Sequence, residues 1–485
     1  MRLGKTALYH FGTQVVISVS GFLATFAIGV FGGSADLGNY TLAVAVGFFW
    51  LAIPISGVAQ AVNKRMSEGA DPGQYFGGGL ALNGVLVVCL TAVVSLTSWL
   101  LQVVETPNQT IVRVIVEYDV EIVILLVGAA AIKTVLFGLQ GQKRVARAGA
   151  LRALDRVVRS GSQVALILLG FGVAAITLGH AASLLFVSIV AIVLAPIRPS
   201  VPRLEHLRGL GEYAKYAWVG ALRSRVYGWL DTLVLGIFLT GTTGASLIGI
   251  YEVAWGIGSL LATASASISS TLFPEMSDLS SDGDYDRVAH FLDEALAFSG
   301  VIVLPGLVGA ITIGERILRF YSGEYVRGYV VLVILVGAYT ADVYANQLLN
   351  TVNAVDRPDA SMRVNAVFIL VNVVLNVVLV WQFSWVGAAV ATAVSASVRT
   401  AGGGIVVHSI LEEAPLPIRP IGSQVVASIA MGGAIVLLAP SVPAGRLWTI
   451  SLVGAGATIY FTVLIALSGR FRTKVQSLVP AVVSV

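Results

Sequence analysis

Fourteen long apolar stretches constrain this sequence more than any other feature. Each approaches the length of about 20 residues that an α-helix needs to cross a bilayer. Only 12% of the 485 residues are charged, about half the share found in soluble domains. Helices are expected, because backbone polar groups in hydrocarbon must be paired within the spanning segment. The predicted spans are residues 8–30, 39–62, 77–101, 117–139, 157–172, 174–195, 214–239, 246–273, 289–313, 328–351, 363–383, 385–408, 421–439 and 447–469.

The distribution of cations predicts the orientation of these spans. With a cytoplasmic N-terminus, 21 Lys and Arg residues fall in inner segments and 5 in outer segments. Cytoplasmic loops of membrane proteins carry such an excess of Lys and Arg. We therefore expect a multi-pass protein of the cytoplasmic membrane with both termini in the cytoplasm. The net charge of +4 follows from the same bias, so the sequence predicts no nucleic-acid partner.

Two of the predicted inner segments are longer than a turn. Residues 142–159 carry six cations at helical spacing. They form either an amphipathic helix on the cytoplasmic lipid surface or an extension of the fifth span. Residues 196–213 contain Pro196, Pro199 and Pro202, and we expect them to link two halves of the chain.

The two halves contain the same unit in the same order. Tyr40 corresponds to Tyr251 at an offset of 211 residues, and Ser67 corresponds to Ser277 at an offset of 210. Because each unit has an even number of spans, six, both insert in the same direction and form a parallel repeat. The expected organisation is a six-helix bundle over residues 1–195, a cytoplasmic linker over 196–213, a second six-helix bundle over 214–410, and two further spans with a cytoplasmic tail over 411–485.

Five short motifs carry a family resemblance. In chain order they are Asp231-x-x-x-Leu235-Gly236, Ile248-Gly249-x-Tyr251, Phe273-Pro274-x-Met276-Ser277, Gly314-Glu315-Arg316-Ile317-Leu318 and Tyr321-x-Gly323-x-Tyr325. Together with the duplication, this series resembles the polysaccharide-transporter branch of the multidrug/oligosaccharidyl-lipid/polysaccharide exporter (MOP) superfamily. That branch includes O-antigen flippases and archaeal flippases for dolichol-linked glycans.

The resemblance implies both a fold and a function. The implied fold is all-α and MATE-like, with about 14 transmembrane helices and two six-helix bundles around a central cavity that opens alternately to each side of the membrane. The implied function is that of a flippase, a transporter rather than an enzyme. Its substrate would be a sugar or oligosaccharide linked to polyprenyl or dolichyl phosphate, for polysaccharide or glycoprotein biosynthesis. We expect no cofactor, and we expect the lipid-linked glycan, membrane lipid and glycosyltransferases of the same pathway as candidate partners.

Cations inside the predicted spans are candidates for binding the phosphate. A charge in hydrocarbon costs about 2.5–3.5 kcal/mol unless it is paired or faces water, and a guanidinium binds phosphate through two parallel hydrogen bonds. We therefore predict phosphate contacts for Arg223 and Arg225 in the seventh span, Arg399 in the twelfth and Lys133 in the fourth. The alternatives are an intramembrane ion pair for the arginines and, for Lys133, a position from which its long side chain reaches the inner surface.

Polar residues of the seventh, eighth and tenth spans are candidates for contacting the sugar or a coupling ion. Amides and aromatic rings suit sugar hydroxyl groups, and buried carboxylates suit coupling to an ion. The alternative for the tenth span is hydrogen bonding between helices. The predicted sugar contacts are Tyr227, Asp342, Asn346 and Gln347, and the predicted coupling residues are Asp231, Glu252 and Asp342.

Two rival functions are compatible with parts of this pattern. A cation-coupled exporter of drugs or metabolites belongs to the same superfamily, but the first span carries no acidic residue between Thr13 and Val30. A membrane glycosyltransferase uses the same lipid donors, but its catalysis calls for carboxylates in long outer loops, and the predicted outer loops are short. The single cysteine, Cys89, and five scattered histidines give no metal-ligand spacing.

Overall fold

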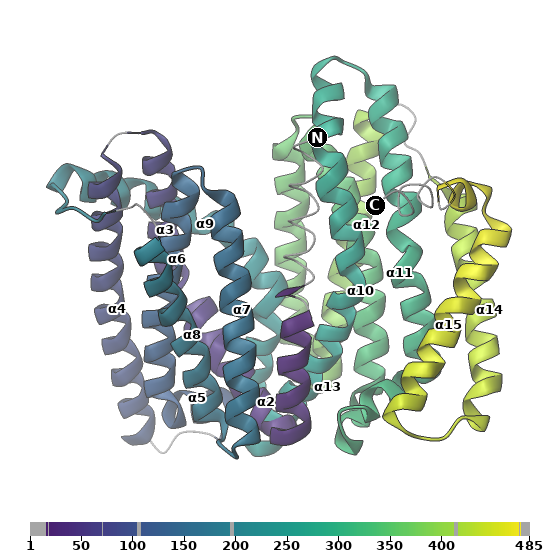
Figure 1. Ribbon diagram of the computed structural model, residues 1–485, viewed down its shortest axis with the longest axis horizontal. Helices are drawn as coiled ribbons and strands as arrows, with labels where there is room; N and C mark the ends of the chain where they lie inside the picture. The colour runs from purple at the N-terminus through teal and green to yellow at the C-terminus, as the bar shows by residue number, and fades with distance from the viewer. Residues whose placement is uncertain are drawn as a thin grey trace. The chain divides into compact units, whose positions relative to one another are not determined.

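The computed structural model describes residues 16–17, 19–69, 71–103, 108–194, 198–411, 416–474 and 476, without the side chains of 194, 218–224, 226–227, 264 and 270. Regular structure in these ranges is helical, apart from a single bridge between Gln109 and Thr240. Contacts divide the chain into two compact units, residues 1–252 and 253–485 (Figure 1).

Ten helices among the described residues are long and apolar enough to cross a membrane. Two others, α7 (Val145–Leu168) and α9 (Leu204–Phe238), have the length of a span but carry several arginines. The protein is therefore an all-α, multi-pass membrane protein, as predicted from its apolar stretches.

Unit 1 begins with a helix that breaks twice. Helical residues 19–27 continue into the π-helical turn η1 (Ile28–Gly32), and Gly33 has a φ of 87°, which interrupts the helix before α2 (Gly33–Val44). A second π-helical segment, η2 (Ala45–Trp50), follows α2. The remaining helices of this unit are α3 (Ile53–Ser67), α4 (Pro72–Val103), α5 (Thr110–Glu117), α6 (Asp119–Gly141), α7, α8 (Val173–Leu194), α9 and the start of α10 (Gly241–Ser281).

Unit 2 contains the rest of α10 and the helices that follow it. Predicted spans 363–383 and 385–408 form the two helical segments of α13 (Pro358–Ile410), which are separated at Ser384, where φ is 55° and ψ is −143°. Helices α14 (Ile418–Leu438) and α15 (Arg446–Leu467) pack on each other at the edge of this unit (Figure 1). The other elements are α11 (Tyr285–Arg319), η3 (Gly323–Gly328), α12 (Tyr329–Ala354) and η4 (Ala439–Ser441).

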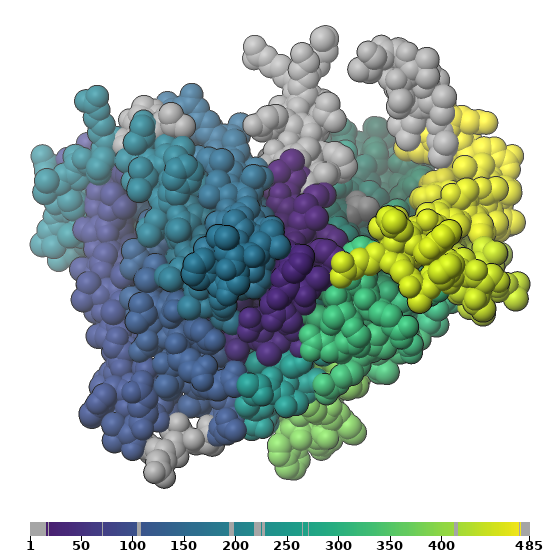
Figure 2. All heavy atoms as spheres, turned by 60° about the horizontal axis from the view of Figure 1, so that its bottom comes forward, coloured from purple at the N-terminus to yellow at the C-terminus, as the bar shows by residue number. Residues whose placement is uncertain are grey.

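Helix α7 shows which interpretation of residues 142–159 is correct. Four of the six cations lie on a single helix that starts at Val145, so the segment extends the fifth span and is not a separate amphipathic helix. Arg159 forms an ion pair with Asp155, and a Cβ on Gly21 would lie 1.8 Å from Arg156 Nη2. Figure 2 shows the first span (purple) directly against α7 (blue). Arg156 and Arg159 therefore face protein, whereas Arg147 and Arg152 are exposed. These four charges explain why hydropathy alone placed the start of this span too late.

Contacts place the boundary between the units inside α10, after Glu252. Helix α9 packs against α3 and α4 of unit 1, and it begins at Leu204, within the predicted linker. The division into bundles at residues 1–195 and 214–410 remains a prediction.

Residues with the same place in the two repeats meet within unit 1. Gly38 of α2 and Gly249 of α10 differ by 211 positions, and each packs against the backbone of the other helix. A Cβ would lie 1.8 Å from Ala245 O at Gly38, and 2.0 Å from Ser34 O at Gly249. The hydroxyls of Ser34 and Ser246 are 2.5 Å apart. Such a self-complementary contact is what a two-fold relation between two copies produces, and glycine permits the close helix approach.

Candidate functional site

A broken helix in unit 1 leaves backbone carbonyls without partners along the chain. The helix formed by α2 and η2 ends at Trp50, and α3 starts at Ile53. Between them, Ala52 has φ and ψ of −82° and 13°, outside the helical region. Pro54, in the first turn of α3, has no N–H to donate back across the break. The last carbonyls of η2 therefore need other donors.

Two cations from other helices supply those donors. Lys133 Nζ, on α6, donates to the carbonyl oxygen of Phe48 and to Ser56 Oγ, both at 3.1 Å. Arg225, on α9, donates through Nη1 to the carbonyl oxygen of Phe49 at 2.5 Å and through Nη2 to Ser56 Oγ at 3.1 Å. Both cations therefore converge on one serine hydroxyl at the start of α3.

Aromatic rings surround this pair of cations. The Lys133 ammonium lies 4.7 Å from the centre of the Phe48 ring, and the Arg225 guanidinium lies 5.2 Å from that of Phe49. Phe49 stacks on Trp229, with ring centres 4.0 Å apart. Rings in these positions stabilise cations electrostatically and fix where the two charges lie.

The cation pair carries excess positive charge. Among the side chains that the structure describes, no carboxylate lies within 4.0 Å of Lys133 or Arg225. The helix end that they cap offsets only about half an elementary charge. An ammonium has three donors and a guanidinium five, so donors on both residues remain unused by the contacts above. The site can therefore accept an anion.

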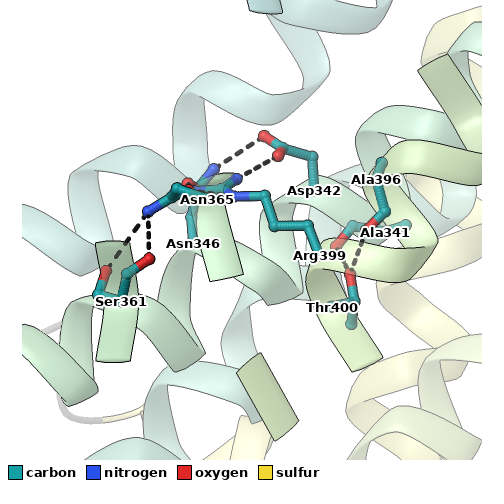
Figure 3. A network of polar contacts seen from close by, with 8 residues as sticks. All are labelled: Ala341, Asp342, Asn346, Ser361, Asn365, Ala396, Arg399 and Thr400. Atoms are coloured by element: carbon teal, nitrogen blue, oxygen red, sulfur yellow. Dashed lines mark hydrogen bonds and ion pairs between the residues drawn. The ribbon is translucent and has the colours of Figure 1, made fainter. Parts of the chain in front are cut away.

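Arg399, the third predicted phosphate contact, lies in a different environment in unit 2. Figure 3 shows it joining α12 and α13 in one polar network. Its guanidinium forms an ion pair with Asp342 and donates to Asn365 Oδ1 at 3.1 Å and Asn346 Oδ1 at 2.9 Å. Asn346 Nδ2 in turn donates to Asp342 Oδ2 at 2.9 Å. The side chains of Arg399 and Asp342 are only 7% and 8% exposed, so this charge is already neutralised inside the unit.

The other predicted polar residues also make contacts within their units. Gln347 Nε2 donates to Ser265 Oγ at 3.0 Å, and its Oε1 accepts from Ser269 at 2.8 Å. Asp231 accepts a hydrogen bond from the hydroxyl of Tyr251. These contacts favour hydrogen bonding between helices, the alternative considered for the tenth span.

The remaining predicted residues are only partly defined by the structure. The side chains of Arg223 and Tyr227 lie outside the described residues. Glu252, at the end of unit 1, is close enough to Arg156 for their charges to interact.

Sequence reasoning missed the residues that hold the cation pair in place. Ser56, Phe48 and Phe49 were not among the candidates, although Pro54 follows three aromatic residues in the middle of a predicted span. A proline there signals free carbonyls one turn earlier, and free carbonyls inside a membrane require donors.

Comparisons with known proteins give the family. A sequence model of the family described as "Polysaccharide biosynthesis protein" matches residues 82–330. The chain is 31% identical to a protein named "Probable flippase AglR" from Haloferax volcanii, over 98% of both chains. It is 27% identical to "Probable low-salt glycan biosynthesis flippase Agl15" from the same organism, over 76% of this chain and 75% of that one.

Solved structures agree on the fold. The chain is similar to the lipid II flippase MurJ in an inward closed conformation, with a TM-score of 0.75 and 13% identity over 95% of this chain and 98% of that one. An inward-facing MATE multidrug transporter of the MOP superfamily gives a TM-score of 0.62 and 16% identity, over 84% of this chain and all of the other. The expected MATE-like fold is confirmed at this level. With the match to AglR over 98% of its length, these findings show that the chain belongs to the polysaccharide-biosynthesis flippases of the MOP superfamily, which are membrane transporters and not enzymes.

Proposed function

We propose that this protein flips a glycan linked to polyprenyl or dolichyl phosphate across the cytoplasmic membrane, and that Lys133 and Arg225 bind the phosphate. The observation that carries the proposal is the pair of converging cations without a carboxylate partner in the described part of the chain. A phosphate crossing hydrocarbon needs such compensation, because an isolated charge there is strongly unfavourable.

The broken helix supports a specific mode of binding. The start of α3 directs the positive end of its dipole toward the break, close to Ser56. A phosphate near Ser56 would accept hydrogen bonds from the unused donors of Lys133 and Arg225, and each such charge-assisted bond contributes about 1.5–3 kcal/mol. Half-helices that end inside the membrane serve anion sites in other transporters. The aromatic rings around the cations suit the adjoining sugar.

Arg399 has less support as a phosphate ligand. Its guanidinium is already bound by Asp342, Asn346 and Asn365, and a phosphate would have to displace a buried carboxylate. We assign Arg399, Asp342, Asn346 and Gln347 to holding unit 2 together. Arg223 and Tyr227 remain candidates for phosphate and sugar, and Asp231 and Glu252 for ion coupling.

The proposal includes the finer topology. Fourteen spans in two parallel six-helix bundles with two C-terminal helices, and both termini in the cytoplasm, agree with the cation bias of the loops. Alternating access between the bundles would carry the phosphate from one side to the other. Glycosyltransferases of the same pathway would supply the substrate on the cytoplasmic side.

The test combines Lys133→Gln with Arg225→Gln in the full-length protein. Flipping of the lipid-linked glycan in proteoliposomes should fall at least tenfold, because about 1.4 kcal/mol of lost binding already corresponds to a factor of ten. The matched control is Lys143→Gln with Arg147→Gln, two exposed cations at the nearby α6–α7 turn, which should flip at the wild-type rate. Thermal unfolding in detergent checks that both variants are folded. A folded double variant of Lys133 and Arg225 that flips normally would refute the phosphate site.

A further inference from the structure

A pocket opens in unit 1 between the end of α3 and the first turns of α9. Its volume is about 370 Å³, and Arg65, Glu212, Tyr213, Tyr216 and Ala217 line it. This volume lies at the lower end of the range for small-molecule sites, about 300–1,000 Å³. Neither Lys133 nor Arg225 lines it, so the pocket is separate from the phosphate site proposed above.

The pocket offers both a hydrogen-bond donor, the guanidinium of Arg65, and an acceptor, the carboxylate of Glu212. Arg65 is held in place, because Nη1 donates to Glu68 Oε2 at 3.2 Å and Nη2 donates to the carbonyl oxygen of Gly209 at 3.4 Å. The Arg65 side chain is 30% exposed, and these two contacts leave further donors of its guanidinium unused. Glu212 is exposed and has no cation within 4.0 Å in the part of the chain that is described. A ligand that both accepts and donates hydrogen bonds fits these two groups.

Two tyrosines add flat surface beside these groups, and Lys215 Nζ lies 4.9 Å from the centre of the Tyr216 ring, which leaves the other face of that ring for a ligand. Tyr213 and Tyr216 are three residues apart on α9, so they share one face of the helix. They remain 39% and 70% exposed. Aromatic rings beside a carboxylate and a guanidinium suit a pyranose ring, whose C–H face is apolar and whose hydroxyls both donate and accept. A phosphate alone would not need the tyrosines and would be repelled by Glu212.

We infer that this pocket binds one or two pyranose rings of the glycan, and that Tyr213 and Tyr216 stack on the sugar while Arg65 and Glu212 bind its hydroxyls. The inference rests on the proposed function and names a second contact for the same substrate. With the proposed topology the pocket lies on the cytoplasmic side, where the headgroup of the lipid-linked glycan enters. The sugar and the phosphate of the substrate therefore bind at different places on the path from the cytoplasm across the membrane.

The test measures sugar binding apart from phosphate binding. Full-length protein in nanodiscs is titrated with the methyl glycosides of glucose, galactose, mannose and N-acetylglucosamine, using saturation-transfer NMR. At least one glycoside should bind, and Tyr213→Ala with Tyr216→Ala should weaken it at least tenfold. Glu212→Gln, which keeps the shape of the side chain, should weaken it less. The matched control is Tyr285→Ala, because Tyr285 is an exposed tyrosine, 45% accessible, at the start of α11.

Flipping separates this inference from the proposed function. The tyrosine double variant should raise the KM for the lipid-linked glycan and leave binding of sugar-free polyprenyl phosphate unchanged. Lys133→Gln with Arg225→Gln should instead weaken binding of sugar-free polyprenyl phosphate. Tyrosines that only anchor the helix at the lipid interface would leave glycoside binding unchanged when replaced, and that result would overturn the inference. Absence of binding of every glycoside to the wild-type protein would overturn it as well, whatever the outcome at Lys133 and Arg225.

Discussion

The buried pair of Arg399 and Asp342 gives a sharp test of the distinction between a structural and a substrate-binding arginine. Removing one partner of a buried ion pair typically costs about 3–5 kcal/mol, because it leaves the other charge uncompensated. Arg399→Gln and Asp342→Asn should therefore each lower the free energy of unfolding by about that amount. The double variant should lose less than either single variant, because it removes both charges together.

An exposed pair in the first segment of α13, before Ser384, provides the control. Arg363 and Asp359 lie on α13 with side chains 78% and 49% exposed and a closest distance of 3.3 Å. Exposed pairs of this kind contribute about 0.2–1 kcal/mol. The same double-mutant cycle at this position should therefore show a coupling energy several times smaller than the cycle at Arg399 and Asp342.

The assay follows unfolding in mixed micelles by SDS titration and, for the same variants, flipping in proteoliposomes. If Arg399 is structural, loss of flipping should track loss of folded protein, and the double variant should recover both. Two results would refute this reasoning. One is an Arg399→Gln variant of undiminished stability that no longer flips, and the other is a double variant whose loss of stability equals the sum of the single losses.

Two further predictions concern the backbone of unit 1 and α10. Gly249→Ala should lower the free energy of unfolding by about 1–3 kcal/mol, the usual cost of overpacking, since its Cβ would lie 2.0 Å from a backbone oxygen. A Cβ on Gly256, on the same helix, would have nothing within 4 Å, so Gly256→Ala should be neutral in SDS titration. Equal losses at the two positions would contradict the close contact. Pro54→Ala should restore an N–H at the helix break. In the register of η2, in which Leu51 N donates to Val46 O, this N–H would compete with Arg225 for the Phe49 carbonyl, so polyprenyl phosphate binding should change in a folded variant. Unchanged affinity in a titration would show that the break does not position Arg225.

The sequence by itself predicted the class of structure and the family. Apolar stretches of spanning length have one solution in a bilayer, the helix, since backbone groups there cannot pair with water. The repeat, too, was visible, because Tyr40 and Tyr251 kept their places in the two halves. Hydropathy placed the start of α7 too late, because the arginines of this helix, two of which face protein, lower its mean hydropathy.

Only the tertiary structure decided which buried cations have a carboxylate partner and which do not. In the sequence, Arg225 and Arg399 are alike, each an arginine inside an apolar span. Folding places Arg399 against a carboxylate and two amides, and places Arg225 beside Lys133 at the open end of a broken helix. The sign and the number of neighbours determine whether a buried charge is neutralised or available to an anion. Those neighbours come from α6, α9, α12 and α13, far apart along the chain, so no local pattern records them.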